Sequence, residues 1–216
     1  MIITIDGPAG TGKTTIAQQV ALRLGFSYFD TGAMYRALTY ALMKNSIDFK
    51  NPKKLEEFLN KFKLEIQRDR GKNRYFVDGE EVTEAIRTPE VTKNVSEIAA
   101  SSKVRESLIE FQRSFGKQNN LVCEGRDMGT TIFPWAELKI FLTARAEVRA
   151  QRRYLEWKDK KMAASPEEIM QELLKRDHLD STREASPLKQ AEHAHLIDTS
   201  DMSIEEVVNI ILSLIL

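Results

Sequence analysis

Eight consecutive residues near the start of the chain have the types and spacing of a phosphate-binding loop. They are Gly7-Pro8-Ala9-Gly10-Thr11-Gly12-Lys13-Thr14, which match the pattern G-x-x-x-x-G-K-[ST]. Glycines let the backbone of such a loop turn its N–H groups toward phosphate oxygens without a clash. The ammonium of Lys13 would reach the β- and γ-phosphates, and the hydroxyl of Thr14 would bind Mg²⁺. The loop therefore predicts a nucleoside triphosphate site.

A second group of candidate residues is a stripe of arginines on one predicted helix that begins near residue 144. The stripe consists of Arg145, Arg149, Arg152 and Arg153, at spacings i, i+4, i+7 and i+8. A polar, lysine-rich segment follows at 156–165, and a Ser165/Glu168 capping box starts another helix. Helix, loop and helix would form a lid whose arginines face the bound phosphates. The alternative is a solvated basic face paired with nearby acidic residues.

Arg176, Asp180 and Arg183 form a third group, spaced i, i+4 and i+7. An exposed intrahelical salt bridge would explain this spacing and would contribute about 0.3–0.5 kcal/mol. The functional alternative places both guanidiniums on phosphate and the carboxylate on a ribose hydroxyl. The spacing alone leaves both interpretations open.

Two loops carry the remaining candidates. The segment 30–36, Asp-Thr-Gly-Ala-Met-Tyr-Arg, follows an apolar run at 26–29, and 124–129, Glu-Gly-Arg-Asp-Met-Gly, follows another at 121–123. In a parallel sheet, ligands gather at the carboxyl ends of the strands. We therefore expect both loops beside the phosphate loop.

The phosphate loop lies between an apolar run, Met1–Ile5, and an amphipathic helix, Lys13–Leu24. Ile16 and Val20 recur on one helix face, and Gly25 should end the helix. Strand and helix patterns alternate along the chain, which predicts an α/β fold with a parallel sheet covered on both faces. Further strands are expected at 121–123, 138–142 and 195–199, and further helices at 89–100, 103–115 (stopped by Gly116) and from 203 to the end.

One stretch breaks the alternation of strands and helices. Residues 64–82 predict a short antiparallel meander with an Asp78-Gly79 hairpin turn. We interpret 36–90 as an insert that covers a second binding site. The chain would then be a single domain, with a core at 1–35, 91–145 and 184–216 and a lid at 146–183.

Composition restricts the class of protein. The 216 residues carry 32 basic and 32 acidic side chains, so a broad nucleic-acid surface is not expected. The single cysteine, Cys123, suits a reducing compartment. The start has no basic signal-peptide region, and the longest apolar stretch, 207–216, is too short to span a bilayer. These features predict a cytoplasmic protein without membrane contact.

With these motifs in place, the chain resembles the bacterial cytidylate kinases of the nucleoside-monophosphate (NMP) kinase family, almost from end to end. The shared motifs are Asp6-Gly-Pro-Ala-Gly-Thr-Gly-Lys-Thr, Asp30-Thr-Gly-Ala-Met-Tyr-Arg, Asp78-Gly-Glu-Glu-Val, Ile86-Arg-Thr-Pro-Glu-Val, Gly125-Arg-Asp-Met-Gly-Thr and Arg176-Asp-x-x-Asp. The resemblance implies a P-loop kinase fold with a central five-stranded parallel sheet, an NMP-binding insert and a short lid. It also implies a monomer that uses ATP, Mg²⁺ and CMP or dCMP.

The resemblance, together with the phosphate loop, assigns roles to individual residues. The expected ATP-binding residues are Gly7, Pro8, Ala9, Gly10, Thr11, Gly12, Lys13, Thr14, Thr15, Arg149 and Arg153. The expected CMP-binding residues are Thr31, Tyr35, Arg36, Ser96, Arg105, Arg126, Asp127, Arg176, Asp180 and Arg183. Arg36, Arg126 and Arg183 would hold the acceptor phosphate and, with Lys13, form the catalytic set.

Within the expected CMP site, Tyr35 would pack against the nucleotide. The cytosine edge would be read by Ser96, Arg105 and Asp127, and the sugar and nearby phosphate would be bound by Arg176 and Asp180. The chain departs from the family pattern at several positions. Thr31 replaces a serine of some members, Glu124 stands where an aspartate near Mg²⁺ is expected, and Leu179 and Ser181 replace additional arginines.

The expected reaction needs no general base, because the acceptor phosphate is already anionic near pH 7. Positioning and charge stabilisation by arginines would supply the catalysis, and the lid would exclude water. The sequence leaves other functions open: a P-loop kinase for another nucleoside monophosphate or small metabolite, and a nucleotide-dependent binding module without turnover. A guanine-specific switch lacks its Asn-Lys-x-Asp motif, and a nucleic-acid-binding ATPase is disfavoured by the balanced charge.

Overall fold

The computed structural model describes residues 1–69, 72–117, 120–159 and 165–215. It divides into two compact units, one of Met1–Phe29 with Gln112–Leu216 and the other of Asp30–Phe111. The predicted insert, 36–90, lies inside the second unit, which extends beyond it in both directions. Residues 160–164 of the predicted lid lie outside the described residues, as do residues 70–71 of the predicted meander.

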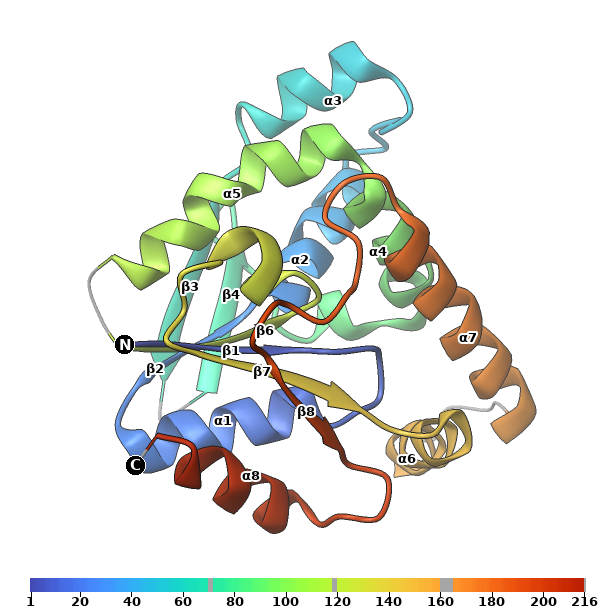
Figure 1. Cartoon of the computed structure of the whole chain (residues 1–216). Helices are drawn as coiled ribbons and strands as arrows, with labels where there is room; N and C mark the ends of the chain where they lie inside the picture. Colours follow the sequence, from blue (N-terminus) through green and yellow to red (C-terminus); the bar gives the residue numbers. More distant parts are fainter. Residues whose placement is uncertain (70–71, 118–119, 160–164, 216) are drawn as a thin grey trace. The chain divides into compact units, whose positions relative to one another are not determined.

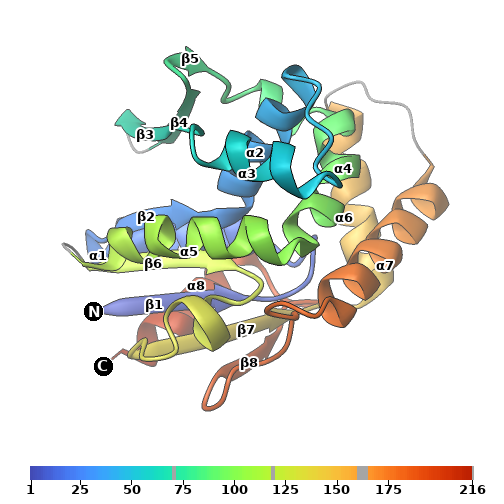
Figure 2. The ribbon, with the colours of Figure 1, turned by 90° about the horizontal axis from the view of Figure 1, so that it is seen from above.

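The first unit is built on a five-stranded sheet with the order β2-β6-β1-β7-β8 (Figure 2). The strands are β1 (Ile2–Asp6), β2 (Ser27–Asp30), β6 (Leu121–Gly125), β7 (Leu138–Thr143) and β8 (His195–Asp198). β1 pairs in parallel with β6 and β7, and β7 pairs in parallel with β8. The predicted parallel sheet is confirmed, and its central strand is the one that leads into the phosphate loop.

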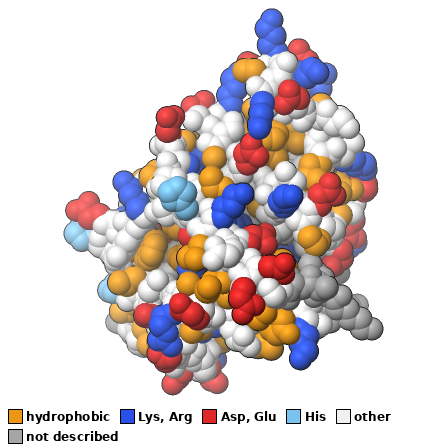
Figure 3. All heavy atoms as spheres, turned by 90° about the vertical axis from the view of Figure 1, so that its right-hand side faces the viewer, with side chains coloured by type: hydrophobic (Ala, Val, Ile, Leu, Met, Phe, Trp, Pro, Cys, Tyr) orange, Lys and Arg blue, Asp and Glu red, His pale blue; other side chains and the backbone are white. Residues whose placement is uncertain are grey.

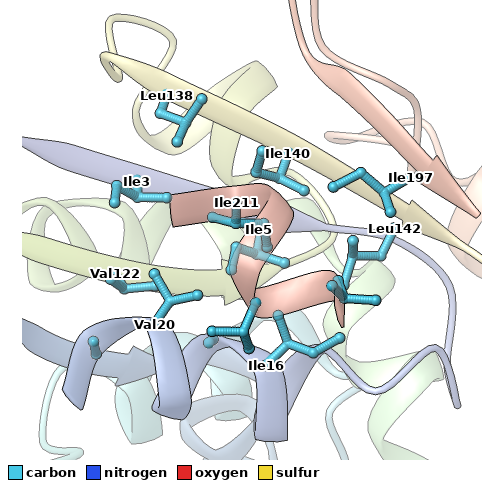
Figure 4. Packing of buried hydrophobic residues seen from close by; sticks show 14 residues of the cluster. Ile3, Ile5, Ile16, Val20, Val122, Leu138, Ile140, Leu142, Ile197 and Ile211 are labelled. Atoms are coloured by element: carbon cyan, nitrogen blue, oxygen red, sulfur yellow. The ribbon is translucent and has the colours of Figure 1, made fainter. Parts of the chain in front are cut away.

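Two helices, α1 (Lys13–Leu24) and α8 (Ile204–Ser213), cover one face of this sheet (Figure 1). Ile16 and Val20 of α1 point toward Ile5 of β1, and Ile211 of α8 joins them (Figure 4). All four side chains are at most 1% exposed. The buried face fixes the direction of α1 and therefore the place where the phosphate loop ends.

Helices α6 (Ala146–Asp159) and α7 (Pro166–Thr182) pack against each other after β7 (Figure 1). The predicted capping box of Ser165 with Glu168 begins α7. A second capping box, of Ser203 with Glu206, begins α8. Gly25 ends α1 with a φ of 68°, and its N–H bonds to the last turn of the helix.

The second unit combines helices with a small antiparallel sheet of the order β3-β4-β5. Its elements are α2 (Thr31–Lys44), α3 (Pro52–Leu59), β3 (Leu64–Asp69), β4 (Lys72–Val77), β5 (Glu80–Glu81), the 3₁₀ turn η1 (Ala85–Arg87), α4 (Pro89–Ala100) and the start of α5 (Ser102–Gly116). Ala37, Tyr75 and Ile86 belong to its buried core. Asp78 and Gly79 have φ angles of 50° and 82°, as a hairpin turn between β4 and β5 requires.

The predicted position of Arg145 on the arginine stripe is wrong. Arg145 does not lie on a helix face with the other arginines, because α6 begins one residue later, at Ala146. The prediction that Gly116 stops α5 is confirmed to within one residue: α5 ends at Gly116 itself, which has no positive φ. A Cβ at Gly116 would lie 2.7 Å from the ring of Phe133, so close packing explains the glycine.

The surface carries charges of both signs. On the face shown in Figure 3, basic and acidic side chains are interspersed with hydrophobic ones. Among residues 1–69, 72–117, 120–159 and 165–215, no helix combines the length and the apolar character that a bilayer span needs.

Candidate functional site

The phosphate loop has the backbone geometry that its glycines predict. Gly7, Gly10 and Gly12 have positive φ angles of 148°, 80° and 87°. A Cβ at Gly7 would lie 2.1 Å from the carbonyl oxygen of Leu142, so the loop passes directly against the end of β7. A Cβ at Gly10 would lie 3.0 Å from Cβ of Arg149. The loop therefore depends on glycine both for its turns and for close approach to its neighbours.

Lys13 lies at the start of α1 and is only 5% exposed. Its Nζ donates to the carbonyl oxygen of Pro8 at 2.5 Å and to the hydroxyl of Thr11 at 3.4 Å. Burial lowers the pKa of Lys13 well below its ordinary value, and the nearby guanidinium of Arg126 lowers it further. A bound anion would relieve both effects, because it supplies the missing negative charge.

Buried arginines and carboxylates form a cluster in the first unit. Nε of Arg126 donates to Oδ2 of Asp180 at 2.8 Å, and Nη1 of Arg183 lies 3.7 Å from Oδ1 of the same carboxylate. Nη2 of Arg183 donates to Oδ1 of Asp127 at 3.5 Å. The exposed salt-bridge interpretation is wrong here, since Asp180 is buried and its closest partner is Arg126, on the loop after β6.

Burial and neighbouring charges shift the pKa values of Arg126 and Asp180 in opposite directions. Burial lowers the pKa of Arg126, but the carboxylate of Asp180 outweighs it and the pKa is raised. Burial also raises the pKa of Asp180, yet the surrounding guanidiniums hold it below its usual value. At Arg176 the balance is reversed: burial and the charge of Arg126 lower its pKa to about 10, although Asp180 and Asp177 oppose the decrease. The buried Nε of Arg176 has no hydrogen-bond acceptor among the described residues.

The arginines of α6 have separate partners. Arg149 is buried and donates to the carbonyl oxygens of Ala144 and Ala9, each at 3.0 Å, and to the carboxylate of Asp177 at 2.5 Å. Arg153 pairs with Glu156 on the surface at 3.0 Å. The contact with Ala9 joins Arg149 to the phosphate loop. The pairing of Arg153 with Glu156 instead agrees with the alternative interpretation, a basic surface paired with nearby acidic residues.

Arg145 and Arg152 complete the predicted stripe. Arg145 forms a two-bond ion pair with Asp201, at 2.6 and 2.8 Å, and both side chains are exposed. Arg152 donates to the backbone and the hydroxyl of Thr199. The four arginines therefore do not share one ligand-facing surface in this structure.

Two carboxylates lie at the ends of the central strands. Asp6 ends β1 and accepts hydrogen bonds from the N–H groups of Met128 and Gly129, at 2.9 and 2.8 Å, in the π-helical turn η2 (Met128–Ile132). Glu124, near the end of β6, accepts a hydrogen bond from the hydroxyl of Tyr28 at 2.6 Å. Its charge acts on Lys13, which places Glu124 near the phosphate loop.

In the second unit, three predicted CMP-binding residues are buried: Tyr35, Ser96 and Arg105. The guanidinium of Arg105 lies over the ring of Tyr35, 5.3 Å from its centre, and donates to the carbonyl oxygen of Ala99 at 3.0 Å. The hydroxyl of Ser96 is buried and has no hydrogen-bond partner among the described residues. Such a hydroxyl is suited to a ligand, because an unsatisfied buried polar group is costly.

Arg36 lies on α2, where its Nη1 donates to the hydroxyl of Thr92 at 2.7 Å and the carbonyl oxygen of Ile86 at 3.4 Å. Thr31 opens the same helix and is buried. The side chain of Asp30 caps this helix by accepting from the N–H of Ala33 at 2.9 Å. The predicted loop at 30–36 is therefore wrong: the Asp30 cap starts α2 at Thr31, so Tyr35 and Arg36 lie on a helix.

The structure brings Arg126, Asp127, Asp180 and Arg183 together in the first unit and Arg105 with Tyr35 in the second. The predicted convergence of Arg36 with Arg126 and Arg183 on one phosphate stays a prediction. Sequence reasoning missed the roles of Asp6 and Thr199. Asp6 had a detectable signal, since a carboxylate ends an otherwise apolar strand. Thr199 had none, because its contact with the loop spans 188 positions of sequence.

A glycine-rich loop between a central strand and a helix, near a cluster of buried arginines, defines this protein as a P-loop kinase. The family model described as cytidylate kinase matches residues 3–216. The chain belongs to the cytidylate kinase family.

Individual relatives agree with this assignment. The chain is 51% identical over 212 residues to the cytidylate kinase of Protochlamydia amoebophila, which covers 96% of this chain and 93% of the relative. It is 46% identical to the cytidylate kinase of Bacillus cytotoxicus over 99% of this chain and 95% of the relative. An uncharacterized protein from Eubacterium ventriosum has a solved structure with the same fold (TM-score 0.55, 10% identity, 100% of this chain and 97% of that chain).

Proposed function

We propose that the protein transfers the γ-phosphoryl group of ATP to the phosphate of CMP or dCMP, which gives ADP and CDP or dCDP. One observation supports this most directly: Lys13 of the phosphate loop is buried near the guanidiniums of Arg126 and Arg176, and each cation lowers its pKa. Buried like charges destabilise one another unless anions bind among them. Two phosphorylated substrates supply such anions.

In this proposal the phosphate loop and Lys13 bind the β- and γ-phosphates, with the residues from Gly7 to Thr15 and the arginines Arg149 and Arg153 on the donor side. The start of α1 adds its helix dipole to the binding of the anion. Lys13 stabilises negative charge that develops during transfer, because its ammonium is already desolvated and held in place. No general base is needed, since the attacking oxygen belongs to an anionic phosphate.

The acceptor residues are carried over by motif. The phosphate of CMP is assigned to Arg36, Arg126 and Arg183, and the base to Ser96, Arg105 and Asp127, with Tyr35 packed against the nucleotide and Thr31 nearby. The sugar is assigned to Arg176 and Asp180. Arginine suits the phosphate because its planar fork bonds two oxygens at once and keeps its charge.

Mg²⁺ fits the oxygen groups present at the loop. Mg²⁺ is usually held by one or two protein oxygens together with substrate phosphates and water. Thr14, half-buried in the first turn of α1, offers a hydroxyl, and Glu124 offers a carboxylate near Lys13. When bound, the ion would neutralise phosphate charge. We further propose a monomer that acts in the cytoplasm.

The test is a coupled ADP-release assay with ATP and Mg²⁺ and a panel of acceptors: CMP, dCMP, UMP, AMP and GMP. We expect the highest kcat/KM with CMP and dCMP. Preference for a purine monophosphate would contradict the assigned acceptor. ATP binding without acceptor-stimulated ADP release would favour a binding module instead.

A further inference from the structure

The phosphate loop has an outer side as well as a ligand side. When a loop turns its N–H groups toward a nucleotide, its carbonyl oxygens point elsewhere and need their own donors. The carbonyl oxygen of Ala9 accepts from Nη1 of Arg149 at 3.0 Å. The carbonyl oxygen of Thr11 accepts from the hydroxyl of Thr199 at 3.2 Å. Side chains from outside the loop therefore hold its outer carbonyls.

Thr199 follows β8 and is 1% exposed. Its hydroxyl lies 3.2 Å from the carbonyl oxygens of both Thr11 and Thr143, so one donor is shared between the loop and the end of β7. The same hydroxyl accepts from Nη1 of Arg152 at 3.0 Å, and Nη2 of Arg152 donates to the carbonyl oxygen of Thr199 at 2.6 Å. Arg152 thus bonds the hydroxyl and the carbonyl of Thr199 and orients the hydroxyl toward the loop.

Arg149 and Arg152 lie three residues apart on α6, so they are neighbours on its surface. One helix therefore supports the loop at two points, at Ala9 directly and at Thr11 through Thr199. The peptide bond is planar, so the orientation of a carbonyl also fixes the N–H of the next residue. Holding the carbonyl of Thr11 fixes the N–H of Gly12, and holding the carbonyl of Ala9 fixes the N–H of Gly10.

We propose that Thr199 and Arg152 are positioning residues that hold the phosphate loop in the shape that binds the donor nucleotide. The inference rests on the proposed role of the loop as the ATP site, and adds residues outside it. Without the Thr199 hydroxyl, the buried carbonyl of Thr11 loses that donor, and the peptide that joins Thr11 to Gly12 is free to rotate. The N–H of Gly12 is then no longer directed at phosphate, and ATP affinity falls.

The test compares Thr199→Val, which keeps the branched shape without the hydroxyl, with Thr199→Ser, which keeps the hydroxyl. ATP affinity is measured by calorimetry on the free protein with Mg²⁺, and the KM for ATP and for CMP is measured separately. We expect Thr199→Val to weaken ATP binding about tenfold and Thr199→Ser to change it less than about twofold, with the KM for CMP unchanged in both. Arg145→Ala is the matched control, because it removes a neighbouring surface ion pair with Asp201 and should leave ATP affinity unchanged.

Arg152→Met is the second variant, and it keeps the apolar stem while it removes both bonds to Thr199. It should weaken ATP binding about threefold, which keeps the test decisive if Thr199→Val does not fold. Equal ATP affinity in the Val and Ser variants, with only a lower Tm, would overturn the inference, as would unchanged affinity in Arg152→Met. Measuring ATP affinity also separates this inference from the proposed function. If the protein bound ATP but did not phosphorylate CMP, the proposed function would be contradicted. The ATP affinities of the variants would still decide the role of Thr199.

Discussion

The carboxylate of Asp180 lies 2.8 Å from Nε of Arg126, and both side chains are largely buried. A second nitrogen of Arg126, Nη1, donates to the carbonyl oxygen of Gly125 at 3.2 Å. These two bonds fix the plane of the guanidinium. Nη2 has no hydrogen-bond acceptor among the residues that the structure describes. Arg126 is therefore held in place by the protein while part of its fork stays available for an anion.

Replacing this arginine should impair the acceptor side of the reaction. We expect Arg126→Met to lower kcat/KM for CMP by about 100-fold, through a higher KM, a lower kcat or both, while ATP affinity changes little. Steady-state kinetics with each substrate varied in turn measure the effect. Arg113→Met is a matched control, because Arg113 also bonds backbone carbonyls, those of Thr131 and Ile132, outside the cluster. If the variant changed only ATP binding, Arg126 would act on the donor ATP, and its assignment to the phosphate of CMP would be wrong.

Replacing Lys13 should impair catalysis without reducing the thermal stability of the protein. Its buried ammonium has a lowered pKa, so removing it relieves a desolvated charge. We expect Lys13→Ala and Lys13→Met to lower kcat by at least about 100-fold, while Tm stays equal or rises. Thermal unfolding and the ADP-release assay measure the two properties on the same samples. Normal turnover in either variant would contradict the assignment of the phosphate loop.

The local elements of the fold were predictable from the sequence because their signals are local. Ser203 and Glu206 are three residues apart, and their capping box marks the start of α8 to within one residue. The glycines of the phosphate loop likewise predict its backbone, since positive φ angles are cheap for glycine alone. The start of α6 was expected near residue 144 and lies at Ala146; a two-residue error is of the size expected at a helix start that lacks such a capping box.

The partners of individual side chains were much less predictable. Arg149 and Arg153 lie four residues apart on the same helix, yet Arg149 is buried against the carbonyl of Ala9 and Arg153 is half-buried beside Glu156. The difference arises from the packing of α6 against α7 and the phosphate loop, which no helical spacing encodes. Asp180 shows the same limit: its spacing left a salt bridge on its own helix and a ligand role equally open, and its closest partner, Arg126, lies on the loop after β6.

Gly7 should be the least replaceable glycine of the loop. A Cβ there would lie 2.1 Å from the carbonyl oxygen of Leu142, so Gly7→Ala must displace either the loop or the end of β7. We expect a loss of at least about 3 kcal/mol of unfolding free energy, with loss of ATP binding. Gly25→Ala is the control, because Gly25 also has a positive φ but nothing lies within 4 Å of its Cβ position. That change should cost about 1 kcal/mol. Urea unfolding compares them, and equal losses would contradict the steric argument.

Asp6 should make the stability of the protein depend on pH. Burial raises the pKa of this carboxyl from 3.8 to about 6, although the N–H groups of Met128 and Gly129 and the charge of Lys13 oppose the increase. A group with a raised pKa in the folded state stabilises the fold below its unfolded pKa, and this contribution is lost as pH rises through the folded value. Between about pH 4 and pH 6, the Asp6 carboxyl should therefore lower the unfolding free energy by about 3 kcal/mol.

Asp6→Asn removes this titration, so the unfolding free energy of the variant relative to wild type should increase from pH 4.5 to pH 7. Urea unfolding followed by circular dichroism at several pH values measures the difference. Glu206→Gln is a control of opposite sign: hydrogen bonds from Ser203 lower the pKa of Glu206, so its stabilisation is present above about pH 4.5 and is lost as pH falls below that value. Parallel pH profiles for Asp6→Asn and wild type would show that the Asp6 carboxyl has the same pKa in the folded and unfolded states, because only a difference between the two produces a slope.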